Sequence, residues 1–567
     1  MMKSNIYYKV SKAVRKSILL LLAPCSLLLA GCNDFLDELP DNRTEANTEE
    51  KVQKLLVAAY PTHDHMAFTE YASDNVDEVL NNSSYKDRFT DQCYAWEDMT
   101  ESNNQSTERY WMDMYQCIET ANMALEGIES MGGATTPSLL AAQAEALLCR
   151  AYAHFMLVNI YAMHYDPNDD TTLGVSYVTE TEKELNPKYQ RETVKENYEH
   201  IAEDISAALP FVSESYYTVP KYHFNKNAAY AFATQFYLYY GDYAKAIECA
   251  NVVLGTNPGS MLRDWATLNK MPDGVQYQQD PTAAHFIDPN VGANLLLLTS
   301  YSNQSIYFGG WGTGKGYAHN EYLAQNETVG AIAAVWGGTY ASLAYPPRRY
   351  TSRNYWSQWR LPLLFEYTDP VAGIGYRHTV YAAFTGDEVL LNRAEAYALL
   401  GQNENARADL QMWFRNVRNN QNYELTLQRI ENFMNGVPYA YDLEDEEGNI
   451  IPNADLTSSP KKHLNPKFIT IEEGSTQECL IQLILTARRY EQLHIGKRWF
   501  DIKRWGIVIP RRQIAASGYP IAITDWLTVD DLRRAIQIPE AVTTAGYEPN
   551  PRIDSESGGG EAETCDR

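Results

Sequence analysis

Residues 225–254 read NKNAAYAFATQFYLYYGDYAKAIECANVVL, and this stretch decides the fold class of the chain. Apolar residues recur at three- and four-residue spacing on both sides of Gly241-Asp242, which is typical of two amphipathic helices joined by a tight turn. Small residues lie where the two helices would cross closely, at Ala228, Ala231, Ala246 and Ala250. The stretch therefore predicts a helical hairpin formed by Asn225–Tyr240 and Tyr243–Leu254.

The same periodicity recurs along much of the chain. It predicts helices over Glu49–Tyr60, Ser106–Met131, Pro137–His164, Thr193–Leu209, Asp387–Leu400 and Glu404–Arg418. The spacing Leu238-x-x-Gly241-x-Tyr243-x-x-Ala246 resembles the tetratricopeptide pattern, although the helix pairs are scattered and do not repeat in tandem. On pattern alone, an unrelated helical bundle is the alternative. We expect a mostly α fold in which tetratricopeptide-like helix pairs form a scaffold.

The first 31 residues have the composition of an export signal. Five basic residues within positions 3–16 precede an apolar run over positions 18–30, which is shorter than a membrane-spanning helix. Leu29-Ala30-Gly31-Cys32 is similar to a bacterial lipoprotein processing site, so we predict that Cys32 is acylated and becomes the mature N-terminus. An ordinary signal with a chance cysteine is the alternative. We predict a signal peptide at 1–31 and an acidic tether at 32–48.

The chain is strongly acidic. Its formal net charge is −26, and loss of the five basic residues of the predicted signal would change it to −31. Such a surface repels phosphate backbones, which excludes nucleic acid as a partner and leaves neutral ligands open. The eight cysteines include no Cys-x-x-Cys pair, and a chain of 567 residues does not depend on disulfides for its stability. We therefore expect no disulfide framework.

Two stretches suggest enzyme or metal chemistry, and each lacks a required residue. Gly309–Gly316 matches a phosphate-binding loop up to Lys315, but Gly316 replaces the Ser or Thr that would bind magnesium. His63-Asp64-His65 offers two imidazoles without an obvious third ligand. Neither Gly-x-Ser-x-Gly nor His-Glu-x-x-His occurs. We expect a protein that is not an enzyme, with no catalytic residue, no metal site and no cofactor, although a role for calcium stays open.

Aromatic residues gather in the middle of the chain. The sequence contains 41 Tyr and 11 Trp, and many of them fall within residues 256–384 among Gly, Asn and Ser. Amphipathic rings on loops are typical of surfaces that bind sugars or peptides. We predict an N-terminal helical part at 49–255, a loop-rich ligand-binding insertion at 256–384 and a C-terminal helical part at 385–567.

Four groups of motifs together resemble the SusD/RagB family of surface nutrient-binding lipoproteins of Bacteroidetes. They are Cys32–Asp37 with Pro40; Ala144–Tyr152 with Asn159–Tyr161 and Arg191–Val194; Asp387–Ala396 with Asn416–Arg418; and Arg488–Leu493 with Gly496–Asp501, Arg504–Gly506 and Ile536–Pro539. The resemblance implies a helical fold beside a variable ligand-binding region. It also implies a lipid-anchored protein on the outer membrane, facing the cell exterior, that delivers ligand to a SusC-like TonB-dependent outer-membrane barrel.

The charged residues of the last motif have a structural interpretation of their own. They alternate in sign at three- and four-residue spacing among aromatic residues, at Arg488, Glu491, Arg498, Asp501 and Arg504. We predict a buried ion-pair network that fixes this segment in the scaffold, in preference to a ligand site. The same role is predicted for Arg150, Glu388, Arg393 and Glu395.

The ligand surface is predicted from aromatic rings that lie near amides. A sugar ring presents apolar C–H faces to aromatic rings and hydroxyl groups to polar side chains. The predicted contacts are Tyr94, Trp96, Tyr301, Asn303, Tyr307, Trp311, Tyr317, Trp336 and Arg353. We hypothesise that Trp96, Tyr307 and Trp311 belong to an exposed platform for a neutral oligosaccharide. An oligopeptide-binding protein of the same transport system is the alternative, and a purely structural surface protein is a third class.

Overall fold

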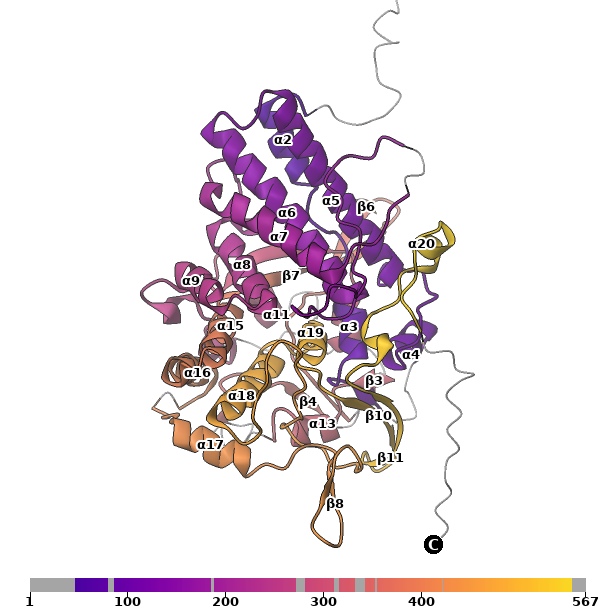
Figure 1. The fold of residues 1–567 in the computed structure, drawn as a ribbon, viewed down its shortest axis with the longest axis vertical. Coiled ribbons are helices and arrows are strands. Elements are labelled where there is room, and N and C mark those ends of the chain that lie inside the picture. The colour runs from indigo at the N-terminus through magenta and orange to yellow at the C-terminus, as the bar shows by residue number, and fades with distance from the viewer. Residues whose placement is uncertain are drawn as a thin grey trace, which may run out of the picture. The chain divides into compact units, whose positions relative to one another are not determined.

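The computed structural model describes residues 46–79, 86–184, 188–271, 281–309, 316–331, 342–351, 354–420 and 422–552. The predicted signal, Cys32 and most of the predicted tether lie outside these ranges. Helices dominate the described part, and they are drawn in sequence order from indigo to yellow in Figure 1. The prediction of a mostly α fold is confirmed. Among the described ranges, no helix is both long and apolar enough to cross a membrane.

Four helices form the N-terminal part of the scaffold. They are α2 (Glu49–Leu56), α5 (Thr107–Ser130), α6 (Pro137–Tyr161) and α7 (Val194–Ala208). Helix α6 packs between α5 and α7 and is buried along most of its length, as its Ala-rich sequence allows (Figure 1). Ser106, Thr136 and Thr193 cap α5, α6 and α7, each accepting a backbone N–H three residues ahead.

The predicted hairpins form as expected. They consist of α8 (Lys226–Tyr240) with α9 (Tyr243–Leu254) and of α15 (Gly386–Leu399) with α16 (Asn403–Val417). Gly241 joins the first pair at φ 91°, in the left-handed region where a side chain is strained. Helix α15 also packs against α9, so the two hairpins share a core.

The C-terminal part adds further helices and two hairpins of strands. They are α17 (Leu427–Asn435), α18 (Thr476–Glu491), α19 (Arg498–Arg504), α20 (Glu540–Thr544), β8 (Leu443–Glu444), β9 (Ile450–Ile451), β10 (Ile509–Ile514) and β11 (Pro520–Leu527). Helix α18 packs against α15, α16 and α17, and β10 pairs with β11. Helix α17 and the β10–β11 hairpin were not predicted from the sequence.

The middle of the chain contains a sheet where the sequence predicted loops. Strand β7 (Ile374–Thr385) pairs antiparallel with β2 (Asn294–Ser300) on one side and β6 (Leu364–Asp369) on the other. The same region also contains short elements: α10 (Trp265–Leu268), α11 (Pro281–Phe286), α12 (Gln304–Phe308), α13 (Glu321–Asn326), β3 (Tyr317–Ala318), β4 (Arg348–Tyr350) and β5 (Tyr355–Ser357). The predicted part boundaries stay a prediction, but residues 256–384 are not loop alone.

An N-terminal segment supplies three further short elements. It contains α3 (Met66–Ala72), β1 (Asp77–Glu78) and α4 (Arg88–Tyr94). Strand β1 pairs with β3, and α3 contacts α4, α12 and α19. Residues from the first hundred positions therefore lie beside elements from positions 304–318 and 498–504.

The buried ion pairs of the last motif are confirmed. Glu395 on α15 pairs with both Arg488 and Arg504, and Arg488 also pairs with Asp501 at 2.6 Å. These residues come from α18 and α19, so the pairs join different helices and are not contacts within one helix. Single buried pairs likewise hold Arg150 to Asp204, Arg393 to Asp409 and Glu388 to Lys497.

A second buried network ties the N-terminal segment to the C-terminal part. Asp74 pairs with Arg498 at 2.9 Å, and the Glu70 carboxylate accepts the backbone N–H groups of His494 and Gly496. Arg489 bridges this network to Glu327, which follows α13, at 2.8 Å. Because breaking a buried pair on one side leaves an uncompensated charge, this network fixes the position of residues 70–78 firmly.

Candidate ligand-binding surface

Gln105 joins the N-terminal segment to the start of the middle region. Its buried side chain accepts the backbone N–H of Asn303 at 2.6 Å and donates to the carbonyls of Tyr301 and Asn104, each at 3.1 Å. The Tyr301 N–H donates to the carbonyl of Thr62 at 2.8 Å. Three segments that are distant in sequence therefore hold the main chain at Tyr301 in one place.

Aromatic rings meet at this junction. The Tyr301 ring is half-buried, and its centroid lies 5.6 Å from that of His63 and 5.3 Å from that of Tyr376, which is 46% exposed on β7. The planes of the two tyrosine rings meet at 70°. We call Tyr301, Tyr376 and His63 the aromatic rim.

Amide side chains border the aromatic rim. Asn103 and Asn104 are exposed beside Gln105, and Asn303 is half-buried at the start of α12, where its side chain makes no capping bond. Partly exposed rings next to primary amides match the apolar faces and hydroxyl edges of a sugar. The arrangement is suited to binding such a ring.

Asp113 on α5 positions His63. Its carboxylate accepts the backbone N–H groups of Thr62 and His63 at 2.7 and 2.9 Å and the Thr62 hydroxyl at 2.9 Å. The His63 Nδ1 atom lies 3.5 Å from the same carboxylate. These contacts fix the turn that carries His63 against Tyr301, so one edge of the aromatic rim is pre-organised.

Comparisons with known families agree with this architecture. Residues 34–238 match a SusD-like family described as "Starch-binding associating with outer membrane", and residues 343–546 match the SusD family. Together the two ranges cover more than half of the chain. The chain belongs to the SusD/RagB family. No curated protein matches it in sequence.

Solved structures share the fold of this SusD/RagB protein. A SusD superfamily protein from Bacteroides thetaiotaomicron VPI-5482 is 18% identical, with a TM-score of 0.59 over 89% of this chain and 100% of that chain. A putative sugar binding protein from Bacteroides vulgatus ATCC 8482 is 16% identical, with a TM-score of 0.58 over 90% and 99%. A SusD-like carbohydrate binding protein from the same strain is 14% identical, with a TM-score of 0.52 over 88% and 96%.

Three of the predicted contacts of the SusD/RagB chain are not exposed. Trp96 is 6% exposed, and its indole N–H donates to the Ala72 carbonyl at 2.8 Å. Tyr94 and Tyr317 are buried and stacked on each other, with ring centroids 4.2 Å apart. The predicted exposure of Trp96 is wrong because Arg511 of β10 packs on Tyr94 and Trp96, and all three rings serve the packing of the scaffold.

Tyr307 is neither fully buried nor fully exposed. Its ring is half-buried and stacked on Phe89, with centroids 5.8 Å apart and planes at 20°. Tyr71 meets it edge-on. The predicted contacts Trp311, Trp336 and Arg353 lie outside the described residues, as does most of the glycine-rich stretch 309–316.

Tyr376 was missed by the sequence analysis. Tyr376, His378 and Val380 are two residues apart and share one face of β7. This spacing of two residues is the signal that could have placed Tyr376 on a strand. Gln105 was also missed, because nothing in its local sequence indicates a contact with residues 301–303.

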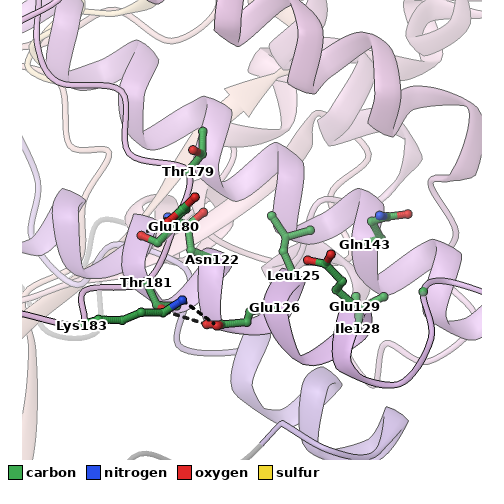
Figure 2. A pocket seen from close by; sticks show the side chains of 11 residues that line it. Asn122, Leu125, Glu126, Ile128, Glu129, Gln143, Thr179, Glu180, Thr181 and Lys183 are labelled. Atoms are coloured by element: carbon green, nitrogen blue, oxygen red, sulfur yellow. Dashed lines mark hydrogen bonds and ion pairs between the residues drawn. The ribbon is translucent and has the colours of Figure 1, made fainter.

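A cavity of about 420 Å³ lies away from the aromatic rim, between α5, α6 and residues 179–183 (Figure 2). Carboxylates and aliphatic side chains line it, among them Leu125, Glu126 and Glu129. Thr181 donates to Glu126 at 2.6 Å, and Lys183 pairs with the same carboxylate at 3.3 Å. Its lining contains no aromatic ring, so it lacks a surface on which a sugar could stack.

The His63-Asp64-His65 stretch does not gather into a metal site. His65 is buried against Thr69, and burial lowers the pKa of its imidazole to about 3. Asp64 accepts the Met66 N–H and the Ser300 hydroxyl instead. Within the described ranges, no three His, Cys, Asp or Glu side chains form a cluster that could hold a metal ion.

Proposed function

We propose that this SusD/RagB protein binds a carbohydrate at the aromatic rim and takes part in nutrient uptake without altering the ligand. The observation that carries the proposal is the junction of the Tyr301 and Tyr376 rings with the amides of Asn103, Asn104 and Asn303. The family description and the sugar-binding names of two similar structures support it.

The proposal extends to ligand class, anchor and partner. We propose that the ligand is a neutral oligosaccharide, since a net charge of −26 disfavours anionic chains. Acylated Cys32 would hold the protein on the outer membrane, facing the cell exterior, and a SusC-like TonB-dependent barrel would receive the ligand. Trp311, Trp336 and Arg353 stay predicted contacts.

Two tyrosines of one hairpin provide a matched test of the site. Glu366 pairs with Tyr376 in the β6–β7 register, so Tyr367, the next residue on β6, points to the opposite face of the sheet. Tyr367 is 58% exposed, comparable with Tyr376. Tyr376→Ala and Tyr367→Ala therefore remove the same exposed side chain from opposite faces.

Isothermal titration of the lipid-free chain with neutral glycans, anionic glycans and peptide digests measures the affinity. We expect saturable binding of a neutral glycan, at least tenfold weaker in Tyr376→Ala and within twofold of the parent in Tyr367→Ala. Equal affinity in both variants contradicts the site. Binding of peptides alone, or release of cleaved glycan, contradicts the function.

A further inference from the structure

Two buried arginines hold N–H groups without acceptors. Arg263 precedes α10 and is 2% exposed, and Arg360 follows β5 and is 6% exposed. Arg263 donates one side-chain hydrogen bond, to Asn294 at 2.7 Å, and Arg360 donates one, to the Tyr490 carbonyl at 3.1 Å. The Nε and one terminal nitrogen of Arg263 and the Nε of Arg360 have no partner among the atoms of the described chain.

Three other buried arginines, Arg498, Arg393 and Arg511, have more side-chain acceptors than Arg263 or Arg360. Arg498 donates two hydrogen bonds to Asp74, and Arg393 donates two to Asp409. Arg511 donates to four backbone carbonyls. An unmet buried donor costs about 1–3 kcal/mol, so three of them in one place indicate that an acceptor belongs there.

The two guanidinium groups face one cavity. Both line a space of about 40 Å³, together with Phe286 and Leu361. The guanidinium carbons of Arg263 and Arg360 lie 4.4 and 5.3 Å from the centre of the Phe286 ring. A single water needs about 10–15 Å³ by this measure, so the cavity has room for a group of about three non-hydrogen atoms.

The carboxyl groups around this cavity do not pair closely with either guanidinium. Glu491 lies 3.9 Å from Arg360 and accepts the Trp413 indole N–H, while Asp387 accepts the backbone N–H of Arg263. Burial raises the pKa of Glu491 to about 8, aided by the charge of Asp387, and burial raises the pKa of Asp387 to about 6.

The remaining charged groups of the cavity neutralise each other. Lys497 donates to both oxygens of Glu388, and Gln492 donates to one of them at 3.0 Å. What the cavity offers is three guanidinium nitrogens of Arg263 and Arg360 that have no acceptor in the described chain.

We propose that the cavity between Arg263 and Arg360 binds a small carboxylate. The two oxygens of a carboxylate lie in one plane and match the N–H donors of a guanidinium group. The negative charge of the ligand would lie where no carboxyl group of the protein pairs closely with Arg263 or Arg360. The carboxylate belongs either to a free ion of the size of formate or to an acidic sugar whose ring stays outside. This site is separate from the aromatic rim and does not depend on glycan binding there.

Titration calorimetry of the lipid-free chain with sodium formate, with glucuronate and with uncharged glucose tests the site. We expect saturable binding at one site for formate, glucuronate or both, and none for glucose. Formate binding assigns a free ion, and glucuronate binding without formate binding assigns an acidic sugar. No binding of either acid overturns the proposal.

Three variants tie the binding to the cavity. Arg263→Gln and Arg360→Lys should each weaken the binding of the acid at least tenfold, and Arg360→Lys keeps the charge if Arg263→Gln fails to fold. Arg407→Gln, whose side chain pairs with Glu404 on the surface of α16, should bind within twofold of the parent chain. Equal binding in Arg360→Lys and Arg407→Gln, or only water between the guanidinium groups in crystals grown with formate, overturns the proposal.

Discussion

The guanidinium carbon of Arg511 lies 4.0 Å from the centre of the Trp96 ring. The same group lies 4.1 Å from the Tyr94 ring and donates to the carbonyls of Tyr71, Ala72 and Ser73. Trp96 itself has φ 55°, a conformation that costs a non-glycine residue about 1–2 kcal/mol. The packing on Arg511 and the hydrogen bond to Ala72 offset that cost, which gives Trp96 a structural role.

We therefore expect Trp96→Ala to act on stability and not on ligand affinity. The loss of a buried Trp lowers the free energy of unfolding by about 3–5 kcal/mol, whereas the exposed Tyr519→Ala changes it by about 0.5 kcal/mol or less. Urea unfolding followed by near-ultraviolet circular dichroism measures both. A Trp96→Ala chain of parental stability with lost glycan binding would show that the indole contacts ligand.

Glu395 offers a test of the buried ion pairs. Glu395→Gln leaves Arg488 and Arg504 without their shared carboxylate, and we expect a loss of about 3–5 kcal/mol in the free energy of unfolding. Glu404→Gln removes an exposed partner of Arg407 and should cost less than about 1 kcal/mol. Urea midpoints measure both variants, and equal losses would argue against a buried network.

His65 predicts a dependence of stability on pH. Burial lowers its pKa to about 3, below the 6.5 of an unfolded histidine, so the unfolded state binds the proton first. This contribution is fully present above pH 6.5 and is lost as the pH falls from about 6.5 to 3, at about 1.4 kcal/mol per unit. Urea unfolding between pH 4 and 7 should show a shallower slope in His65→Asn than in the parent chain. Parallel slopes would mean that His65 titrates normally.

Gly241 tests the turn of the first hairpin. Its φ of 91° is strained for any other residue, although a Cβ there would meet no neighbouring atom. Gly241→Ala should therefore lower the free energy of unfolding by about 1–2 kcal/mol through the backbone alone. Gly259→Ala, at a position with space and no positive φ, is the control and should change it by about 0.5 kcal/mol or less. Thermal melts compare the two, and equal melting temperatures would contradict the assigned turn.

Local patterns predicted the helices well, and contacts distant in sequence decided the rest. Tyr243–Leu254 forms α9 with the predicted bounds, because apolar spacing and the turn at Gly241 act within the segment. The burial of Trp96 depends on Arg511, and the position of Tyr301 depends on Gln105. Neither partner is visible from local sequence, so local patterns indicated which regions are rich in aromatic residues but did not separate the packed rings from the exposed ones.

Glu70 accepts the backbone N–H groups of His494 and Gly496, and these two hydrogen bonds affect how the chain folds. A polypeptide that stops before these residues leaves the Glu70 carboxylate and Asp74 without their partners, so its first half cannot reach its final form alone. Folding must close a loop of more than 400 residues, and topologies rich in such closures form slowly. A truncation that removes His494, Gly496 and Arg498 should therefore abolish the whole fold instead of trimming it.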